Sequence, residues 1–390
     1  MLRLLGLVVL CASLRAETVV VLRFFNHANS ASLDWIGESI AETVQDSLGS
    51  EGLLVLGRED KAEAYRRLTL RPGAELTHAS IIKVGEALDA ARVVYGSYEL
   101  LPAEGGAPVS KGSLRITARV LYLKETRQGP LFSELGALED LAALEARLGW
   151  QTLRQLDPHN PRSEEDFLKV RPPVRIDAVE SYVRGLLAED PEQRQHLFIQ
   201  AARLDEHYSQ PCFQLGKSYW EKHEYKVAAG WLARVGPFDR RYLEAQFFLG
   251  LCRYHIEDYA AARQSFQIVA QTMPLNEVFN DLGASEVRLN DYAAAAASFQ
   301  KALEGDSADP DYHFNLGYAE WRAGHYQLAS DSFRAVLDRA PDDQEATLML
   351  GRSLKGEGPR PGEPRLEDRV RIKTNYEEEA YRQLQAELKK

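Results

Sequence analysis

A Leu-Gly pair that returns at almost constant spacing constrains the second half of this 390-residue chain more than any other feature. Successive glycines lie 34, 33, 34 and 34 residues apart. The pairs are Leu215-Gly216, Leu249-Gly250, Leu282-Gly283, Leu316-Gly317 and Leu350-Gly351. A period of this length is typical of stacked supersecondary units, each of which buries its apolar face against its neighbours.

Three further positions recur in phase with the first four pairs. A tyrosine follows each glycine, then an alanine, then a bulky apolar residue. These are Tyr225, Tyr259, Tyr292 and Tyr326; Ala228, Ala262, Ala295 and Ala329; and Leu232, Phe266, Phe299 and Phe333. The pattern resembles the tetratricopeptide repeat. The glycine of helix A and the alanine of helix B are small enough for the two antiparallel helices to cross closely. The tyrosine and the bulky residue are expected to fill the wedge against the next repeat.

The resemblance implies an all-α superhelix over residues 175–354. We predict repeats at 175–208, 209–242, 243–275, 276–309 and 310–343, with one more helix A at 344–354. The first repeat is degenerate, because Ser181-Tyr182 replaces Leu-Gly, although Phe198 and Ala201 stay in phase. Residues 355–390 are predicted as a linker followed, from Leu366 to Lys390, by a charged helix that caps the stack or forms a tail.

The concave face of such a superhelix is lined mainly by A helices, and it is the predicted binding surface for a peptide. The family's second, fifth, ninth and twelfth helix positions face the groove. Those singled out here are Phe213, Lys217, Trp220, Phe247, Tyr254, Asn280, Phe314, Tyr318 and Trp321. Phe213, Phe247 and Phe314 fit an ordinary core between repeats equally well. The residues at the twelfth position, Trp220, Tyr254 and Trp321, are expected to be partly exposed.

The charge of this groove indicates its partner. The carboxylate clamp that some repeats of this family carry is absent, because Glu221 follows Lys217 by four residues and Tyr318 precedes Arg322. Glu244, Glu277 and Asp311 form an acidic rim at the second positions. An aromatic groove with this rim favours an apolar or mildly basic peptide.

Residues 17–156 have a different pattern and predict a mixed α/β domain. Thr18 to Phe25 is a β-branched, nearly continuous apolar run, as in a strand buried on both faces. Leu114 to Tyr122 alternates apolar and polar residues and predicts a strand with one wet face. Further strands are predicted at 53–56, 93–100 and 131–135, with a long loop at 102–112. Helices are predicted at 34–48, 61–70, 78–91 and 138–156.

Within this domain, a strand of the type VVVLRFFN leads into a helix that carries Asp34, Trp35, Gly37 and Glu38. The succession resembles the amino-terminal domain of Tol-type (TolB-like) periplasmic translocation proteins and of several envelope assembly lipoproteins. The resemblance implies a non-catalytic domain for protein contacts in the cell envelope.

No constellation for catalysis or for a cofactor can be assembled from the sequence. The loop from Asn26 to Ser32 contains no glycine, and Asp34 already supplies a negative charge at the helix start, which disfavours phosphate binding. His27 has no second His or Cys at metal spacing, and a solvent-facing loop histidine is the simpler interpretation. A G-x-S-x-G nucleophile elbow is absent. The net charge of −11 argues against a nucleic-acid partner. We expect a protein that is not an enzyme and needs no cofactor.

The first sixteen residues predict export. Arg3 precedes an apolar run from Leu4 to Leu14, and the run is too short to span a bilayer, so we predict a signal peptide over 1–16 that is cleaved near Ala16. A buried first strand or helix is the alternative. The predicted location is periplasmic or secreted, including association with the outer membrane, with no transmembrane segment in the mature chain.

Cys212 and Cys252 would remain in the mature chain. They lie six positions out of phase on successive parallel A helices, about 9 Å apart along the axis, beyond the roughly 7 Å limit for a disulfide. We predict two buried thiols.

Four prolines, Pro158, Pro161, Pro172 and Pro173, mark residues 157–174 as a linker in which further helix is disfavoured. The chain is therefore predicted to be a non-catalytic scaffold of the cell envelope, with protein or peptide partners. The alternative is an envelope sensor or assembly factor whose α/β domain binds a small ligand.

Overall fold

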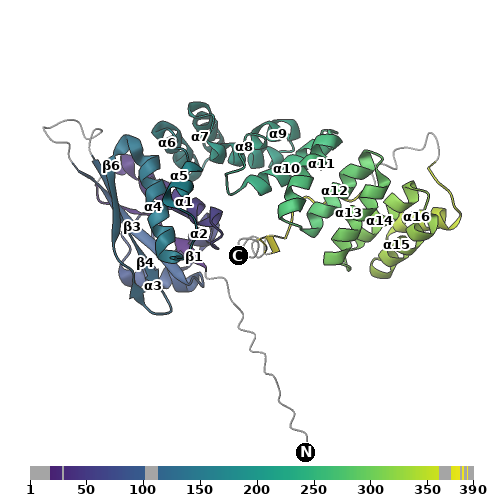
Figure 1. The fold of residues 1–390 in the computed structure, drawn as a ribbon, viewed down its shortest axis with the longest axis horizontal. Helices are drawn as coiled ribbons and strands as arrows, with labels where there is room; N and C mark the ends of the chain where they lie inside the picture. Colours follow the sequence, from purple (N-terminus) through teal and green to yellow (C-terminus); the bar gives the residue numbers. More distant parts are fainter. Residues whose placement is uncertain are drawn as a thin grey trace, which may run out of the picture. The chain divides into compact units, whose positions relative to one another are not determined.

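The computed structural model describes residues 18–28, 30–101, 113–359, 370–377, 380, 381 and 384. The predicted signal peptide and the predicted loop at 102–112 lie outside the described residues. The chain divides into two compact units, one ending at Lys169 and the other beginning at Val170. The first is α/β and the second is a series of helix pairs, which confirms the predicted fold class (Figure 1).

The first unit contains one sheet and its covering helices. Its elements are β1 (Val19–Val21), β2 (Phe25–Asn26), the 3-10 helix η1 (Ala31–Leu33), α1 (Trp35–Ser50), α2 (Arg58–Arg67), α3 (His78–Ala87), β3 (Arg92–Leu101), β4 (Ser113–Tyr122), β5 (Arg127–Gln128), β6 (Phe132–Ala137), the 3-10 helix η3 (Leu138–Asp140), α4 (Leu141–Leu156) and α5 (Glu164–Lys169). β1 and β2 pair with β3 in parallel, while β4 is antiparallel to β3 and pairs with both β5 and β6.

The strand patterns explain this sheet. All three residues of β1 are fully buried, as the continuous apolar run predicts. Along β4, Leu114, Ile116, Ala118 and Val120 are buried and the three polar residues between them are partly exposed, which confirms the predicted alternation up to Val120. The strand predicted at 53–56 is reduced to one bridge between Val19 and Val55.

The close contact of α1 with Phe24 explains why the motif at the start of α1 contains a glycine at position 37. A Cβ built on Gly37 would lie 2.1 Å from the main-chain oxygen of Phe24. The main-chain oxygen of Gly37 accepts a hydrogen bond from the N–H of Phe24 at 3.1 Å. A larger residue at this position would therefore separate α1 from the edge of the sheet.

The predicted linker at 157–174 differs from expectation in one respect. α5 forms between Pro161 and Pro172, although the prolines were expected to disfavour helix there. Phe167 of α5 is fully buried, and its ring lies 5.5 Å from that of Trp150 in α4. One large aromatic anchor thus holds a short helix that local preference alone would not support.

The second unit consists of α-helices that follow one another along the chain (Figure 1). They are α6 (Ile176–Leu187), α7 (Pro191–Leu204), α8 (Ser209–Glu221), α9 (Tyr225–Leu232), α10 (Tyr242–His255), α11 (Tyr259–Thr272), α12 (Asn276–Arg288), α13 (Tyr292–Gly305), α14 (Pro310–Arg322), α15 (Tyr326–Arg339) and α16 (Gln344–Leu354). The A helices are α8, α10, α12, α14 and α16. Asp258 and Asp291 are the N-cap residues of the B helices α11 and α13, and each side chain accepts a hydrogen bond from a main-chain N–H in the first turn.

The Leu-Gly glycine lies where the two helices of a repeat cross. A Cβ on Gly250 would lie 2.7 Å from the ring of Phe266, and the same distance separates a Cβ on Gly283 from Phe299. The bulky residue of helix B therefore packs directly over the glycine of its own repeat. In the degenerate first repeat, Gly185 packs against Phe198 in the same way, although Ser181-Tyr182 replaces the Leu-Gly pair there.

The turn between helices A and B repeats a left-handed backbone. His223, Glu257 and Asn290 have φ of 59°, 64° and 62°, and Gly324 has φ of 84° at the corresponding position. Only Gly324 has the residue type that adopts this conformation without steric cost. The tight packing of each repeat thus holds three other residues in a disfavoured conformation.

Residues 370–377 correct the prediction of a charged helix from Leu366. They form neither helix nor strand, whereas residues 380, 381 and 384 are helical. Val370 and Ile372 pack against the apolar core of the last repeats, while the main chain of this segment bonds to side chains of α12 and α14. These bonds replace those that a helix would make within itself.

Candidate peptide-binding groove

The nine residues predicted to line the groove fall into two sets. Phe213 and Phe247 are buried, and Asn280, Phe314, Tyr318 and Trp321 are completely so. Lys217, Trp220 and Tyr254 are partly exposed. We call the surface formed by α12, α14 and α16 the covered half, and the surface formed by α8 and α10 the open half. Residues 357–358, 370–373 and 377 contact the covered half. Phe213 and Phe247 are buried although they belong to the open half, and the ring of Tyr376 packs against Phe247.

Two asparagines hold the main chain of Arg371. The side-chain oxygen of Asn315 accepts the N–H of Arg371 at 2.8 Å, and its side-chain nitrogen donates to the oxygen of the same residue at 2.8 Å. The side-chain nitrogen of Asn280 donates to that oxygen as well, at 2.8 Å. Asn315 also donates to the side-chain oxygen of Asn280 at 2.7 Å, which fixes both amides. Every one of these contacts to Arg371 involves its backbone.

Two acidic side chains continue this main-chain recognition along the segment. Asp281 accepts the N–H of Lys373 at 2.8 Å, and Glu277 accepts the N–H of Glu377 at 3.0 Å. The ring of Tyr376 then packs edge-on against Phe247 of α10, with centroids 5.2 Å apart. The segment therefore runs from the last repeats back toward α10, opposite to the order of the repeats.

The side chain of Arg371 occupies an acidic pocket. Its guanidinium lies 3.1 Å from Asp311, 2.7 Å from Asp343 and 3.5 Å from Glu345. The same group lies 3.9 Å from the centre of the Phe314 ring, so a cation–π contact accompanies the ion pairs.

Lys373 has its own set of partners. Its ammonium lies 2.9 Å from Asp309 and 2.7 Å from Asp311, and 5.1 Å from the ring centre of Tyr312. Asp311 thus bridges the two cations of the segment. Of the three acidic residues predicted at the second helix positions, Asp311 contacts these two basic side chains, whereas Glu277 accepts the main-chain N–H of Glu377 and Glu244 lies 4.0 Å from Lys217.

Trp321 is the residue for which the sequence prediction is wrong. It is completely buried, not partly exposed. Its indole N–H donates to the main-chain oxygen of Glu357 at 2.8 Å, and the guanidinium of Arg352 lies 4.9 Å from its ring. The chain that follows α16 therefore covers a side chain that would otherwise face the concave surface.

In the open half, Lys217, Trp220 and Tyr254 are partly exposed, whereas three phenylalanines of the same helices are buried. Trp220 packs beside Tyr225, Phe248 and His255, with ring centroids 5.2–5.8 Å apart. The ammonium of Lys217 lies 3.5 Å from the Phe248 ring centre and 4.0 Å from Glu244. Trp220 and Tyr254 are partly exposed, as predicted.

Sequence reasoning missed several residues that contact the segment. Asp281 and Asn315 occupy the sixth helix position, one beyond the fifth position that had been mapped, and Asp309 and Asp343 begin α14 and α16. The signal available was the aspartate at each helix start, since a capping carboxylate beside the groove can also bind a cation.

Two carboxyls of the covered half have opposite pKa shifts. Burial raises the pKa of Asp281 well above its ordinary value, and the bonds from Lys373 and Asn280 only partly oppose this. For Asp343, burial acts in the same direction, but hydrogen bonds from the Ala346 N–H and Arg371 outweigh it and lower the pKa. The stabilising contribution of Asp343 is therefore present above its ordinary pKa and is lost as the pH falls through the lowered one.

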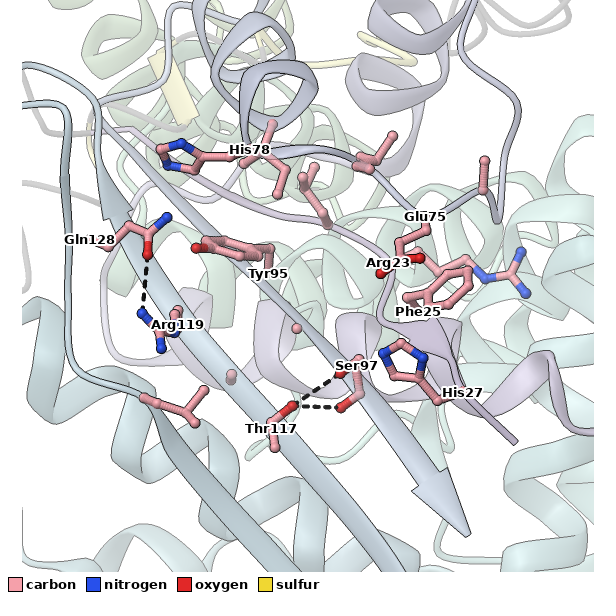
Figure 2. Close-up of a pocket in the computed structure, with 17 residues that line it drawn as sticks. Arg23, Phe25, His27, Glu75, His78, Tyr95, Ser97, Thr117, Arg119 and Gln128 are labelled. Atoms are coloured by element: carbon pink, nitrogen blue, oxygen red, sulfur yellow. Dashed lines mark hydrogen bonds between the residues drawn. The ribbon is translucent and has the colours of Figure 1, made fainter. Parts of the chain in front are cut away.

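A separate cleft of about 310 Å³ lies in the α/β unit, between the start of α3 and the strands β3 and β4 (Figure 2). Arg119 donates to Gln128 at 3.0 Å on one side, and Ser97 and Thr117 bond to each other on its floor at 3.1 Å. His27 lies at its edge and is exposed, as predicted. Arg23 donates to the main-chain oxygen of Asp34 at 2.7 Å.

The described residues contain no cluster of three or more His, Cys, Asp or Glu arranged to hold a metal ion. Among the helices in the described ranges, none combines the length and the apolar character needed to cross a membrane. Cys212 and Cys252 are both buried, as predicted, and burial raises their thiol pKa to about 11 and about 12.

Comparisons with known proteins agree with the helix pairs. A family model of the tetratricopeptide repeat matches residues 213–274, 280–344 and 314–354. The match begins at residue 213, so the TolB-like character of residues 17–156 stays a prediction. A comparison with curated proteins gives no match.

Solved structures with a similar fold include two repeat proteins. YrrB, described as a TPR protein with an unusual peptide-binding site, is 21% identical over 40% of this chain and 82% of its own, with a TM-score of 0.37. MamA from residue 41 to its end, from Desulfovibrio magneticus RS-1, is 20% identical over 43% of this chain and 98% of its own, with a TM-score of 0.38. The likeness concerns the fold alone. The second half of the chain is a tetratricopeptide-repeat domain, a fold of protein-interaction scaffolds.

Proposed function

We propose that the chain is a non-catalytic scaffold that holds a protein partner through an extended segment laid along the concave face of its repeats. The observation that carries this proposal is the side-chain clamp on the main chain of Arg371 by Asn280 and Asn315. Donors and acceptors arranged in this way suit any extended backbone. The partly exposed Trp220 and Lys217 extend the same surface toward a larger partner.

The proposed place of action is the cell envelope. Two features of the sequence support it: the apolar leader before Ala16 and the resemblance of residues 17–156 to Tol-type envelope domains. Export predicts that the mature protein begins near Glu17, in the periplasm, at the outer membrane or outside the cell. An intact Met1 on the protein from a cytoplasmic fraction, determined by mass spectrometry, would contradict it.

Site-specific photo-crosslinking tests the groove directly. In one variant, a photoreactive amino acid replaces Lys217 in the open half. In the matched control, it replaces the exposed Leu328 of α15, a B helix in a different repeat. We expect a defined crosslinked product from position 217 in the native host that position 328 does not give, and that Trp220→Ala weakens. Equal products from both positions would show that the concave face has no special role.

A cleft in the α/β unit supports a second candidate function, in which a small ligand binds there and the protein acts as a sensor or assembly factor. The cleft presents Arg119, Ser97 and Thr117 from adjacent strands. The test is a thermal-shift screen of the full chain with small anionic and neutral metabolites. Stabilisation that Arg119→Ala removes would support this function, and no stabilisation by any compound would exclude it for the classes screened.

A further inference from the structure

Residues 370–377 lie in the groove in the manner of a bound peptide. Their backbone is recognised by Asn280, Asn315, Asp281 and Glu277, while residues 371–373 make no helical or sheet bonds. Tyr376 contacts Phe247 of α10, although the segment follows α16 in sequence. An extended segment advances about 3.3 Å per residue, so a few residues suffice to span neighbouring repeats.

The side chains of the segment alternate in their surroundings. Val370 and Ile372 pack on the apolar core, while Arg371 and Lys373 reach the carboxylates. A period of two is the natural consequence of an extended backbone. The groove therefore selects a sequence in which two cations are separated by one apolar residue, with an aromatic side chain three residues further on.

The charge balance of the covered half favours a cationic occupant. Asp309, Asp311, Asp343 and Glu345 surround the two basic side chains, and Glu277 bonds to the backbone beside them. A groove with this excess of carboxylates repels an acidic segment. Buried amides such as Asn280 and Asn315 would also be left unsatisfied against an apolar surface.

The segment lies on the repeats and does not pass through their core. The side chains of Arg371 and Lys373 remain 23% and 21% exposed, and Thr374 and Asn375 are exposed. The helix crossings at Gly283 and Gly317 involve residues of the repeats alone. Departure of the segment would therefore uncover the groove without separating these helices.

We propose that the covered half is a binding site for an extended cationic segment of another protein, of the pattern apolar-basic-apolar-basic-x-x-aromatic, and that residues 370–376 occupy it as an internal competitor. This inference rests on the proposed function, because it names the class of partner and the regulation of the same groove. The occupied groove is the resting state, and a partner must displace the segment to bind.

Binding of a peptide to the full chain tests the proposal. The probe is the labelled peptide VRIKTNYE, which copies residues 370–377. The protein variant Arg371→Ala with Lys373→Ala weakens the internal segment while leaving the groove intact. We expect it to bind the probe at least tenfold more tightly than the parent chain does. Adding Asp311→Asn to this variant should weaken probe binding about tenfold, because Asp311 contacts both cations.

A matched control peptide is VIRKTNYE, which has the same composition with the two cations adjacent. It should bind at least tenfold more weakly than VRIKTNYE, because one cation then points away from the carboxylates. If the double variant keeps a cooperative melt but does not bind the probe, or if both peptides bind equally, the proposal is wrong. The crosslink from position 217 does not depend on this result, so the two failures can be told apart.

Hydrogen exchange on the unaltered chain covers the case in which the double variant does not fold. The N–H groups of Arg371 and Lys373 should exchange at least tenfold faster than the slowest N–H groups of α12 and α14, and an excess of unlabelled VRIKTNYE should accelerate them further. Exchange only through global unfolding would make the segment a permanent part of the repeat domain and would overturn the proposal.

Discussion

Trp220 and Trp321 occupy the same position of their repeats but have different surroundings. Trp220 is partly exposed beside Phe248 and His255, whereas Trp321 is completely buried and bonded to the main-chain oxygen of Glu357. The repeat pattern treats the two tryptophans as equivalent. The difference arises because the chain folds back over one half of its own groove, so a position in a repeat fixes where a side chain points but not what covers it.

The largest expected effect is on stability. Trp321→Ala should lower the free energy of unfolding by about 3–5 kcal/mol, because it leaves a cavity in a closed core. Trp220→Ala, the matched control, should cost about 1 kcal/mol or less, since its side chain is partly in solvent. Urea unfolding followed by circular dichroism measures both. Equal losses of stability would show that the residues after α16, which cover Trp321, do not make its environment different from that of Trp220.

Asn315→Ala should have the next largest effect, because it removes two bonds to the main chain of Arg371 and the bond to the side chain of Asn280. We expect a loss of about 1–3 kcal/mol in the free energy of unfolding, with faster hydrogen exchange at Arg371. Gln214 lies at the same repeat position in the open half and is partly exposed. Gln214→Ala should change stability by less than about 0.5 kcal/mol. A comparable loss for Gln214→Ala would remove the distinction between the halves.

Asp281 gives the covered half a dependence on pH. Because its pKa is raised in the folded state, the folded protein keeps a proton that the unfolded chain has released. Stability therefore decreases as the pH rises above the ordinary pKa and through the raised one. Asp281→Asn should unfold like the parent near pH 4 and be the more stable of the two at pH 8.

The exposed Glu304 provides the control for this pH effect. Glu304→Gln should change the stability by less than about 0.5 kcal/mol, since it is a substitution of an exposed side chain. Thermal melts of the three proteins at pH 4, 6 and 8 measure the difference. If Asp281→Asn shows no gain between pH 4 and pH 8, the buried carboxyl does not titrate as described.

The smallest expected effect concerns the thiols. Cys212 of α8 and Cys252 of α10 are both buried in the open half, and burial raises their pKa values to about 11 and about 12. Since the thiolate is the reactive form, both should stay unreactive toward a thiol reagent at pH 8 until the chain unfolds. Rapid labelling of either cysteine in the native protein would show that the open half opens more readily than the described packing implies.

The sequence predicts the repeats well because their determinants are local. Glycine in helix A, and alanine and a bulky residue in helix B, meet within one repeat, as Gly250 and Phe266 do. The alternation of Leu114, Ile116 and Val120 predicts β4 for the same reason. By contrast, α5 depends on the tertiary contact of Phe167 with Trp150. The prolines on both sides of α5 predict that no helix forms there, and no local pattern reports this contact.

The covered groove could not be predicted in this way. Arg371 meets Asn280 and Asn315 across many intervening residues, and no local pattern reports such a contact. The alternation of Val370, Arg371, Ile372 and Lys373 was visible as a sign of an extended segment. The charged residues that follow favoured a helical interpretation, and helix propensity gave no indication that side chains would supply the bonds to this backbone.

Glu357 and Val370 both contact the repeats. Residues 370–376 are therefore covalently linked to the site that they occupy. Short tethers give effective concentrations on the order of mM, which do not fall when the protein is diluted. A free peptide of equal intrinsic affinity must approach that concentration before it occupies half of the grooves. A partner that also contacts Trp220 and Lys217 gains avidity and reaches the same occupancy at a far lower concentration. Under the proposed competition, the tether therefore favours partners that make more contacts with the groove.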